Sequence, residues 1–364
     1  MPDFIPGAML SNMFYHECVR PILEADFKQL KYAAALIGSG SEVLGFDTPM
    51  SSDHHWGPRV MLFLAEHDFD RCRTQIHDRL ANKLPHTFKG YSTNFTLPDP
   101  NDSGVQQLES ITVGPVHHRV EVFTIKDFFK EYLGVDPFVE IDVGDWLTIP
   151  SQKLRTIVAG AIYHDAVGLT PIQKKFKFYP KDIWLYLLAA GWTRISQEEA
   201  FVGRTGLVGD ELGSGIIASR LVRDLMRLCF LMERTYAPYA KWFGSAFAQL
   251  QCAPELLPTL QQVGKAADWE ERQAKLSRAY SIVAGMQNAL GLTPPLPEQV
   301  TSYFSRPFQV IHGGRFARAL RESIQDDAVR DIPVDIGSID QFSDSTDLME
   351  AVKLRPILKQ LYKG

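Results

Sequence analysis

The chain contains few cysteines, and they form no recognisable pattern. Its 364 residues include four, none of which belongs to a Cys-x-x-Cys pair: Cys18, Cys72, Cys229 and Cys252. This spacing is not that of a disulfide framework or of a cysteine-based zinc site. We therefore expect reduced, mostly buried thiols in a cytoplasmic protein.

Long apolar runs, internal repeats and low-complexity tracts are also missing from the sequence. No run reaches the roughly eighteen residues that a membrane-spanning helix needs. Residues 1–7 lack the basic region and the apolar stretch of a signal peptide. We expect no membrane association.

The sequence has no large excess of charge of either sign. It contains 38 Lys+Arg and 43 Asp+Glu, so its formal net charge is −5. Such a chain has no overall attraction for nucleic acid, and an RNA or DNA substrate would require a local basic patch.

The length and a hydrophobic content of 45% predict two domains. Residues 1–149 combine strand and helix patterns, which predicts a small mixed sheet covered by helices. The expected strands are residues 32–37, 60–65, 91–97, 111–113 and 119–125, and the expected helices are 13–30 and 68–84. The predicted fold class is therefore α+β.

Longer helical patterns follow from residue 150 onward. They predict an α-helical bundle over residues 150–300 that supplies the substrate groove, and a C-terminal segment, 301–364, that covers one of the other two parts. The expected helices are residues 182–192, 216–232, 254–262, 269–290, 316–324 and 348–362, with a short strand at 307–312.

The most informative stretch follows the first apolar run. Residues 32–37 end in Gly38-Ser39, and the small residues that continue to Ser41 would let backbone N–H groups approach an anion closely. Asp53 and His55 lie two apart on an extended segment before the second apolar run, so both would face the same side and could hold one divalent cation. A Gly-Ser turn alone is more often an ordinary tight turn, and the later acidic residues favour a site.

A third acidic residue occurs on a later strand. Glu121 lies between Val120 and Val122, so its side chain would point to the opposite face from theirs. A carboxylate suits a metal-binding rim better than a sheet core, although a simple exposed strand residue would look the same.

These residues resemble the nucleotidyltransferase superfamily that includes DNA polymerase β and the kanamycin nucleotidyltransferases. The shared pattern is an apolar run, Gly-Ser, a spacer, acid-x-acid and a later acid on a strand. More narrowly, Gly45-Phe46-Asp47-Thr48 and Ser52-Asp53-His54-His55-Trp56-Gly57-Pro58-Arg59 resemble a bacterial domain-of-unknown-function family of predicted nucleotidyltransferases. That resemblance continues through residues 223–228, 239–242 and 336–342.

The resemblance implies a metal-dependent transfer of a nucleoside monophosphate from an NTP, with ATP as the expected donor, to an acceptor hydroxyl. Gly38 and Ser39 would hold the triphosphate, and Asp53, position 55 and Glu121 would bind Mg²⁺ or Mn²⁺ and act as the catalytic residues. Pyrophosphate would leave. The acceptor is left open among a small molecule, a protein and an RNA end.

Position 55 departs from the superfamily, because His55 replaces a metal-binding carboxylate. A neutral imidazole suits magnesium badly, since magnesium prefers oxygen ligands. Three explanations stay open: a different divalent metal, substitution by another acid such as Asp47, or a degenerate nucleotide-binding or interaction protein that no longer reacts.

Other charged residues are candidates for contacts with phosphate or for proton transfer. Arg59 and Lys241, which precedes Trp242, are candidate nucleotide-binding residues. Arg220, Arg223, Arg227 and Arg234 would share one helix face, either for phosphates or paired with Asp224 and Glu233. Glu198 and Glu199 are the acids available as a general base. The pairs His67-Asp68 and His117-His118 lack the ligand spacing of a zinc site.

Overall fold

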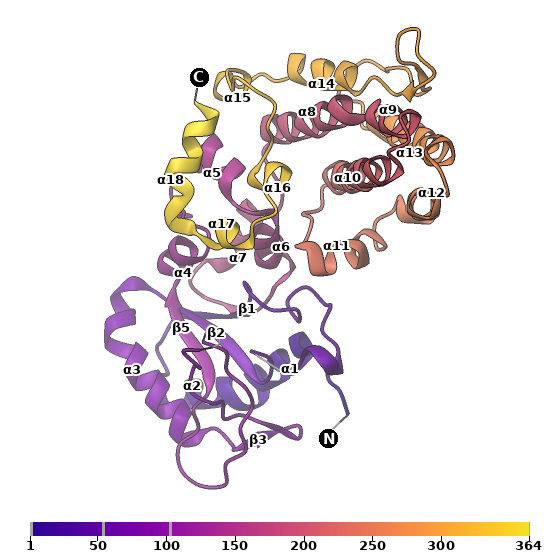
Figure 1. Ribbon diagram of the computed structural model, residues 1–364. Coiled ribbons are helices and arrows are strands. Elements are labelled where there is room, and N and C mark those ends of the chain that lie inside the picture. Colours follow the sequence, from indigo (N-terminus) through magenta and orange to yellow (C-terminus); the bar gives the residue numbers. More distant parts are fainter. Residues whose placement is uncertain (1–2, 53–54, 102–103, 364) are drawn as a thin grey trace. The chain divides into compact units, whose positions relative to one another are not determined.

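The computed structural model describes residues 3–52, 55–101 and 104–363 and separates into two compact units (Figure 1). Unit 1 comprises Met1–Ile141 and Lys153–Lys177, and unit 2 comprises Asp142–Gln152 and Phe178–Gly364. The chain therefore crosses between the units three times, whereas the sequence analysis placed one boundary near residue 150 and separated the last 64 residues. In the structure those last residues belong to unit 2.

A four-stranded mixed sheet forms the centre of unit 1, in the order β5-β2-β1-β6. Its strands are β1 (Tyr32–Leu36), β2 (Arg59–Leu64), β5 (Arg119–Thr124) and β6 (Ala161–Asp165). β1 is a continuous apolar run, β2 is apolar after Arg59, and both are buried throughout, as expected of central strands. β5 alternates between buried and partly exposed residues, as expected of an edge strand.

Helices cover this sheet. They are α1 (Gly7–Phe14), the π-helical turn η1 (Tyr15–Val19), α2 (Arg20–Asp26), α3 (Glu66–Lys83), α4 (Ile125–Tyr132), α6 (Ser151–Ala159, of which residues 153–159 belong to unit 1) and α7 (Leu169–Lys175). Smaller elements are the 3₁₀ turn η2 (Pro49–Ser51) and the paired strands β3 (Thr87–Phe88) and β4 (Tyr91–Ser92).

One face of the sheet carries an apolar core of unit 1. Leu62 and Val120 lie on this face and belong to the same buried cluster as Phe14 of α1 and Ile76 of α3. Full burial of one such side chain stabilises the fold by roughly 1.5–3 kcal/mol. The sheet is thereby fixed against α1 and α3. On the opposite face Phe63 and Phe123 pack against Phe128 of α4, and the charged residues described below lie on that face at the ends of the strands.

Unit 2 is helical, as the sequence predicts for this region. Its long helices are α8 (Lys181–Glu198), α9 (Phe201–Leu207), α10 (Glu211–Met232), α11 (Ala240–Phe247), α12 (Ala253–Lys265), α13 (Trp269–Ala289) and α14 (Gly313–Glu322). Short elements are α5 (Val143–Thr148), β7 (Thr301–Ser302), β8 (Gln309–Val310), α15 (Asp327–Arg330), α16 (Ile339–Phe342), α17 (Thr346–Glu350), η3 (Val352–Leu354), α18 (Arg355–Leu358) and η4 (Lys359–Tyr362).

The central helix of unit 2 is α8, which is apolar on nearly all sides and packs against α10 and α14. Trp192 stacks on Phe316 of α14 with ring centroids 4.3 Å apart. Gly191 lets Leu228 of α10 approach closely, because a Cβ atom there would lie only 2.6 Å from its side chain. A residue with a side chain at position 191 would push the two helices apart.

The predicted α+β class, with a small mixed sheet followed by helices, is confirmed, but several predicted elements were wrong in detail. Residues 111–113 form no strand, and the strand expected at 91–97 shrinks to β4 and one bridge between Phe95 and Leu108. The expected helix 348–362 breaks into four short turns. Ala351, with ψ of 72°, interrupts it, and Pro356 occupies the first turn of α18.

Within the described residues, no helix is long and apolar enough to cross a membrane.

Candidate functional site

Three strand ends meet at one edge of the sheet in unit 1. β1 runs antiparallel to β2 with Ala35 opposite Met61, so the turn after β1 lies beside the start of β2. β5 runs parallel to β2 and begins level with it, because Arg59 lies opposite Arg119. The Gly-Ser turn, the segment before β2 and the first residues of β5 therefore share this edge, which we call the strand-end site.

Glu121 faces the same side of the sheet as the charged residues of this edge. It lies opposite Met61 and two residues beyond Arg119, while its neighbours Val120 and Val122 belong to the buried core on the other face. Its side chain is partly exposed. The alternation in the sequence predicted this orientation.

The turn after β1 holds backbone N–H groups at the edge. Gly38 has a φ of +81°, and its own N–H donates to the carbonyl of Thr156 at 3.2 Å. The next three N–H groups, those of Ser39, Gly40 and Ser41, have no acceptor among the described residues. Of the two residues expected to hold the triphosphate, Gly38 therefore has its N–H engaged, whereas the N–H of Ser39 has no acceptor in the described part of the chain.

Arg59 fixes this turn from the neighbouring strand. Its Nε donates to Oε1 of Glu42 at 2.7 Å and its Nη2 donates to the carbonyl of Ser39 at 2.6 Å. Both side chains of the ion pair are buried. At Gly40, with a φ of +143°, a Cβ atom would collide with this guanidinium and carboxylate, so glycine is required there. Arg59, a candidate for phosphate contact in the sequence analysis, is thus engaged in holding the turn.

His55 is bound by an arginine of β5. Arg119 Nη1 lies 3.1 Å from Nδ1 of His55 and donates to its carbonyl at 3.0 Å. Because a guanidinium can only donate, Nδ1 accepts, and a neutral ring then carries its proton on Nε2. Burial and the nearby Arg59 lower the pKa of Arg119, while Glu121 and Glu42 act in the opposite direction.

The predicted metal ligands can be assessed only in part, because Asp53 lies outside the described residues. Among the residues that are described, no three His, Cys, Asp or Glu side chains gather closely enough to hold a metal. Glu121 offers the oxygen ligand that magnesium prefers, whereas His55, with Nδ1 engaged, does not fit. Asp47 accepts hydrogen bonds at Oδ2 from the backbone N–H of Gly7 (2.6 Å) and from Trp56 Nε1 (3.0 Å), so it ties the loop together.

The two candidate general bases, Glu198 and Glu199, lie in unit 2, where each binds neighbouring side chains or backbone groups. Glu198 pairs with Arg220 at 2.6 Å and with Arg194 at 3.3 Å. Glu199 accepts from the backbone N–H groups of residues 311, 312 and 313 at the start of α14. Burial raises the pKa of Glu199 to about 7, against those hydrogen bonds.

The four arginines that were expected to share one helix face do not form one anion-binding row: Arg220, Arg223 and Arg227 lie on α10, and Arg234 follows its end. Arg220 pairs with Glu198, as described above, and Arg234 lies over the rings of Phe178 and Trp184, 5.4 and 5.0 Å from their centroids. Arg223 and Arg227 both bind Asp344, at 2.7 and 3.2 Å.

Of the two predicted acidic partners, Asp224 pairs with the arginines and Glu233 does not. Asp224 Oδ1 lies 3.6 Å from Arg223 Nε and 3.8 Å from Arg227 Nη1. Glu233 accepts from the N–H groups of Gln251 and Cys252 instead of pairing with an arginine. Lys241 is exposed on α11, with Nζ 5.0 Å from the centroid of the Trp242 ring.

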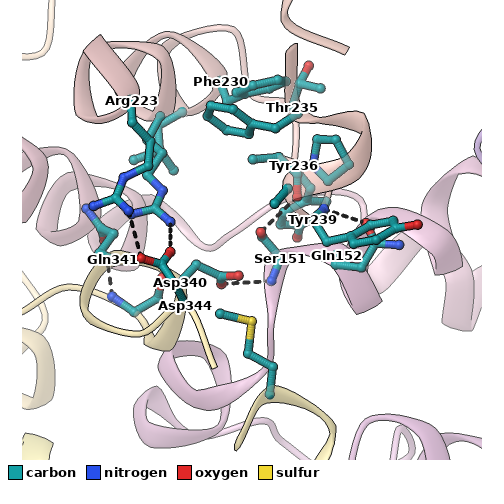
Figure 2. A pocket seen from close by; sticks show the side chains of 18 of the residues that line it. Ser151, Gln152, Arg223, Phe230, Thr235, Tyr236, Tyr239, Asp340, Gln341 and Asp344 are labelled. Carbon is teal, nitrogen blue, oxygen red and sulfur yellow. Dashed lines mark hydrogen bonds and ion pairs between the residues drawn. The ribbon is translucent and has the colours of Figure 1, made fainter. Parts of the chain in front are cut away.

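A cavity of about 240 Å³ lies within unit 2 and was not predicted as a site (Figure 2). It is bordered by the end of α10, the segment that follows it, the start of α6 and the loops around α16. Its lining includes Ser151, Gln152, Tyr179, Arg223, Arg227, Phe230, Tyr236, Tyr239, Phe243, Asp340, Gln341 and Asp344. In the sequence, this cavity was indicated only by the family resemblance of residues 223–228, 239–242 and 336–342, because each of these segments contributes residues to its lining.

Comparison with known proteins gives one family match. Residues 146–243 match the model of a family described as "Domain of unknown function (DUF4037)". The predicted resemblance to a domain-of-unknown-function family is confirmed over this segment. A nucleotidyltransferase-like protein from Exiguobacterium sibiricum 255-15, known from a crystal structure, is similar at 10% identity and a TM-score of 0.32, over 95% of this chain and 88% of that one. No curated protein matches the chain.

The matched segment covers most of the lining of the cavity in unit 2, including Ser151, Arg223 and Tyr239. The strand-end site of unit 1, from Gly38 to Glu121, lies before it. The two sites are therefore supported by different observations and are treated separately below.

Proposed function

We propose that unit 1 is a nucleotidyltransferase domain that moves a nucleoside monophosphate from an NTP, with ATP as the expected donor, to an acceptor hydroxyl and releases pyrophosphate. The observation that carries this proposal is the meeting of three strand ends at one edge of the sheet. There the turn after β1, residues 55–58 before β2, and the start of β5 with Glu121 lie at the same edge.

The turn supplies the phosphate contacts in this proposal. The N–H groups of Ser39, Gly40 and Ser41 would bind triphosphate oxygens, because they have no acceptor among the described residues. Arg59 holds the carbonyl of Ser39, so the amides are oriented before the nucleotide arrives. Such preorganisation avoids an ordering cost during the reaction.

Asp53 and Glu121 are the proposed metal ligands, and Mg²⁺ or Mn²⁺ the proposed metal. A divalent cation bound there would neutralise charge on the triphosphate and favour in-line attack on the α-phosphorus. His55 is proposed as a positioning residue, because Arg119 already binds its Nδ1. The expected nucleotide contact of Lys241 stays a prediction.

A second function is favoured by the same bond between Arg119 and His55. If position 55 gives no ligand, the site has one carboxylate fewer than the superfamily pattern requires. Arg119 lies at this edge and adds positive charge there, whereas the charge of Arg59 is balanced by Glu42. The alternative is therefore a protein that binds nucleotides at the strand-end site and does not transfer them.

The two functions are separated by measuring binding and turnover on the same full-length protein. Binding is followed by fluorescence of a labelled ATP analogue, and turnover by pyrophosphate release from each NTP with Mg²⁺ or Mn²⁺. Candidate acceptors are small hydroxyl compounds, RNA ends and the protein itself. We expect turnover, and we expect Asp53→Asn and Glu121→Gln to reduce it at least about 100-fold while ATP binding persists.

The control is Glu131→Gln, which neutralises an exposed carboxylate of the same unit and should change neither quantity. ATP binding without turnover under every condition would support the alternative. Absence of both binding and turnover would contradict the two proposals together.

A further inference from the structure

Three segments of unit 2 that stood out in the sequence converge on one cavity, and the proposed transfer chemistry does not use it. Arg223 and Arg227 come from the first segment, Tyr239 from the second, and Asp340 and Gln341 from the third. All of them belong to unit 2. The cavity is therefore formed by tertiary packing within this unit, from residues that are far apart in the chain.

One side of the cavity is aromatic. Phe230, Tyr236 and Tyr239 lie opposite the charged residues (Figure 2), and Phe243 adds another ring to the lining. Sites for drug-sized ligands usually measure about 300–1,000 Å³. A cavity of about 240 Å³ is thus suited to a small molecule with a single ring. Flat aromatic walls favour a flat, apolar ring as occupant.

The other side carries two guanidiniums that share one carboxylate. Asp344 Oδ2 accepts from Arg223 Nη1 at 2.7 Å, and its Oδ1 accepts from Arg227 Nη2 at 3.2 Å. The side chains of Arg223 and Arg227 are 33% and 17% exposed, whereas that of Asp344 is 68% exposed. Because the carboxylate of Asp344 is already largely hydrated, breaking its bonds to the two arginines costs it little free energy.

We propose that this cavity binds a small aromatic acid, whose carboxylate or phosphoryl group replaces Asp344 between Arg223 and Arg227 while its ring packs against Phe230 and Tyr236. The replacement leaves no buried charge without a partner, because Asp344 becomes hydrated as the ligand acid takes its two hydrogen bonds. Guanidinium groups match the oxygens of both acid types. This proposal does not depend on the transfer chemistry of unit 1.

A cationic ligand is the main competitor, because aromatic rings and acidic side chains also suit an ammonium group. The charged groups that line the cavity favour the acid. Asp344 is engaged by both arginines, and Asp340 accepts the N–H of Ser151 at Oδ2, at 2.8 Å. A cation would have to lie beside two guanidiniums.

The test measures binding of four simple probes to the full chain by titration calorimetry at constant ionic strength. They are benzoate, phenyl phosphate, the uncharged benzyl alcohol and the cation phenyltrimethylammonium. We expect benzoate or phenyl phosphate to bind saturably and at least tenfold more tightly than the other two. The tighter of the two acids identifies the acid group that the site prefers.

Variants then test the exchange with Asp344. Asp344→Asn removes the internal competitor from an exposed position and should tighten the preferred acid five- to tenfold, a gain that misfolding cannot produce. Arg223→Gln should weaken it at least tenfold. Arg278→Gln, at an exposed arginine of the same unit, and Asp53→Asn should leave it unchanged.

Three results would overturn the proposal. The first is failure of both acids to bind either the native chain or Asp344→Asn. The second is equal or tighter binding of benzyl alcohol or the cation. The third is an affinity for the preferred acid that Asp344→Asn leaves unchanged or lowers.

Discussion

Arg59 links the start of β2 to the turn that follows β1. Its guanidinium, buried with the carboxylate of Glu42, also binds the carbonyl of Ser39. A buried pair of this kind adds little net stability compared with an apolar pair, but losing one partner leaves a charge buried without compensation. At the residue scale, the geometry of the strand-end site therefore depends on this one ion pair.

Arg59→Gln should lower the free energy of unfolding by about 3–5 kcal/mol, because it leaves Glu42 buried and unpaired. Urea denaturation measures the change. The double variant with Glu42→Gln should lose less than the sum of the two single variants, since the residues interact directly. Arg73→Gln, at an exposed arginine of the same unit, serves as the control and should change stability by less than about 0.5 kcal/mol. A loss below about 1 kcal/mol for Arg59→Gln would contradict the assigned role.

His55→Asp should raise the rate of pyrophosphate release. Aspartate would add the carboxylate that the site lacks, and Arg119 lies where it can bind the new side chain. Steady-state turnover with Mg²⁺ measures the effect, and His55→Asn serves as a matched control that adds no charge. A lower rate with Asp than with histidine would instead identify the imidazole as a true ligand.

At the scale of elements, Asp165 joins the end of β6 to the start of α7. Its carboxylate accepts from the backbone N–H groups of residues 167, 168, 169 and 170, at 2.7–3.2 Å. Burial acts to raise the pKa of this carboxyl, but the hydrogen bonds outweigh burial and lower the pKa from 3.8 to about 2. The first turn of α7 is thus held by an ionised acid.

Asp165→Asn should lower the free energy of unfolding at pH 7 by about 1–2 kcal/mol, allowing for partial exposure to solvent. Because the folded chain binds this proton less tightly than the unfolded chain, the stabilisation is complete above about pH 4 and lost as the pH falls toward 2.

The difference between Asp165→Asn and the native chain should therefore shrink over that pH range. Denaturation curves at several pH values measure it, with Asp70→Asn as a control at an exposed position of the same unit. A difference that does not change with pH would refute the role of the ionised carboxylate.

At the scale of the whole molecule, the elements that sequence predicts best are those with a strong local pattern. The apolar runs at residues 32–37 and 60–65 became β1 and β2, and the helices expected at 182–192 and 216–232 lie within α8 and α10. β6 was missed because its sequence, AIYHD, has two polar residues and lies on an exposed sheet edge. Antiparallel pairing with β1, and not the periodicity of its own sequence, defines this strand.

The candidate sites likewise include features that a local sequence pattern predicts and features that it does not. The alternation of residues 120–122 was enough to predict on which face of the sheet Glu121 lies. The Gly38-Ser39 turn was recognisable from its local sequence. The role of Arg59 was not visible, because a buried ion pair and a phosphate-binding arginine have the same local sequence. The cavity of unit 2 was hidden because Ser151, Arg223 and Asp344 meet only through tertiary packing.

The most direct test of the central claim is a crystal structure of the full chain with Mn²⁺ and a non-hydrolysable ATP analogue. The account predicts an anomalous manganese peak coordinated by the carboxylates of Asp53 and Glu121. It also predicts triphosphate oxygens bonded to the N–H groups of residues 39–41. Nucleotide and manganese bound elsewhere, or a Glu121 carboxylate turned away from both, would contradict it.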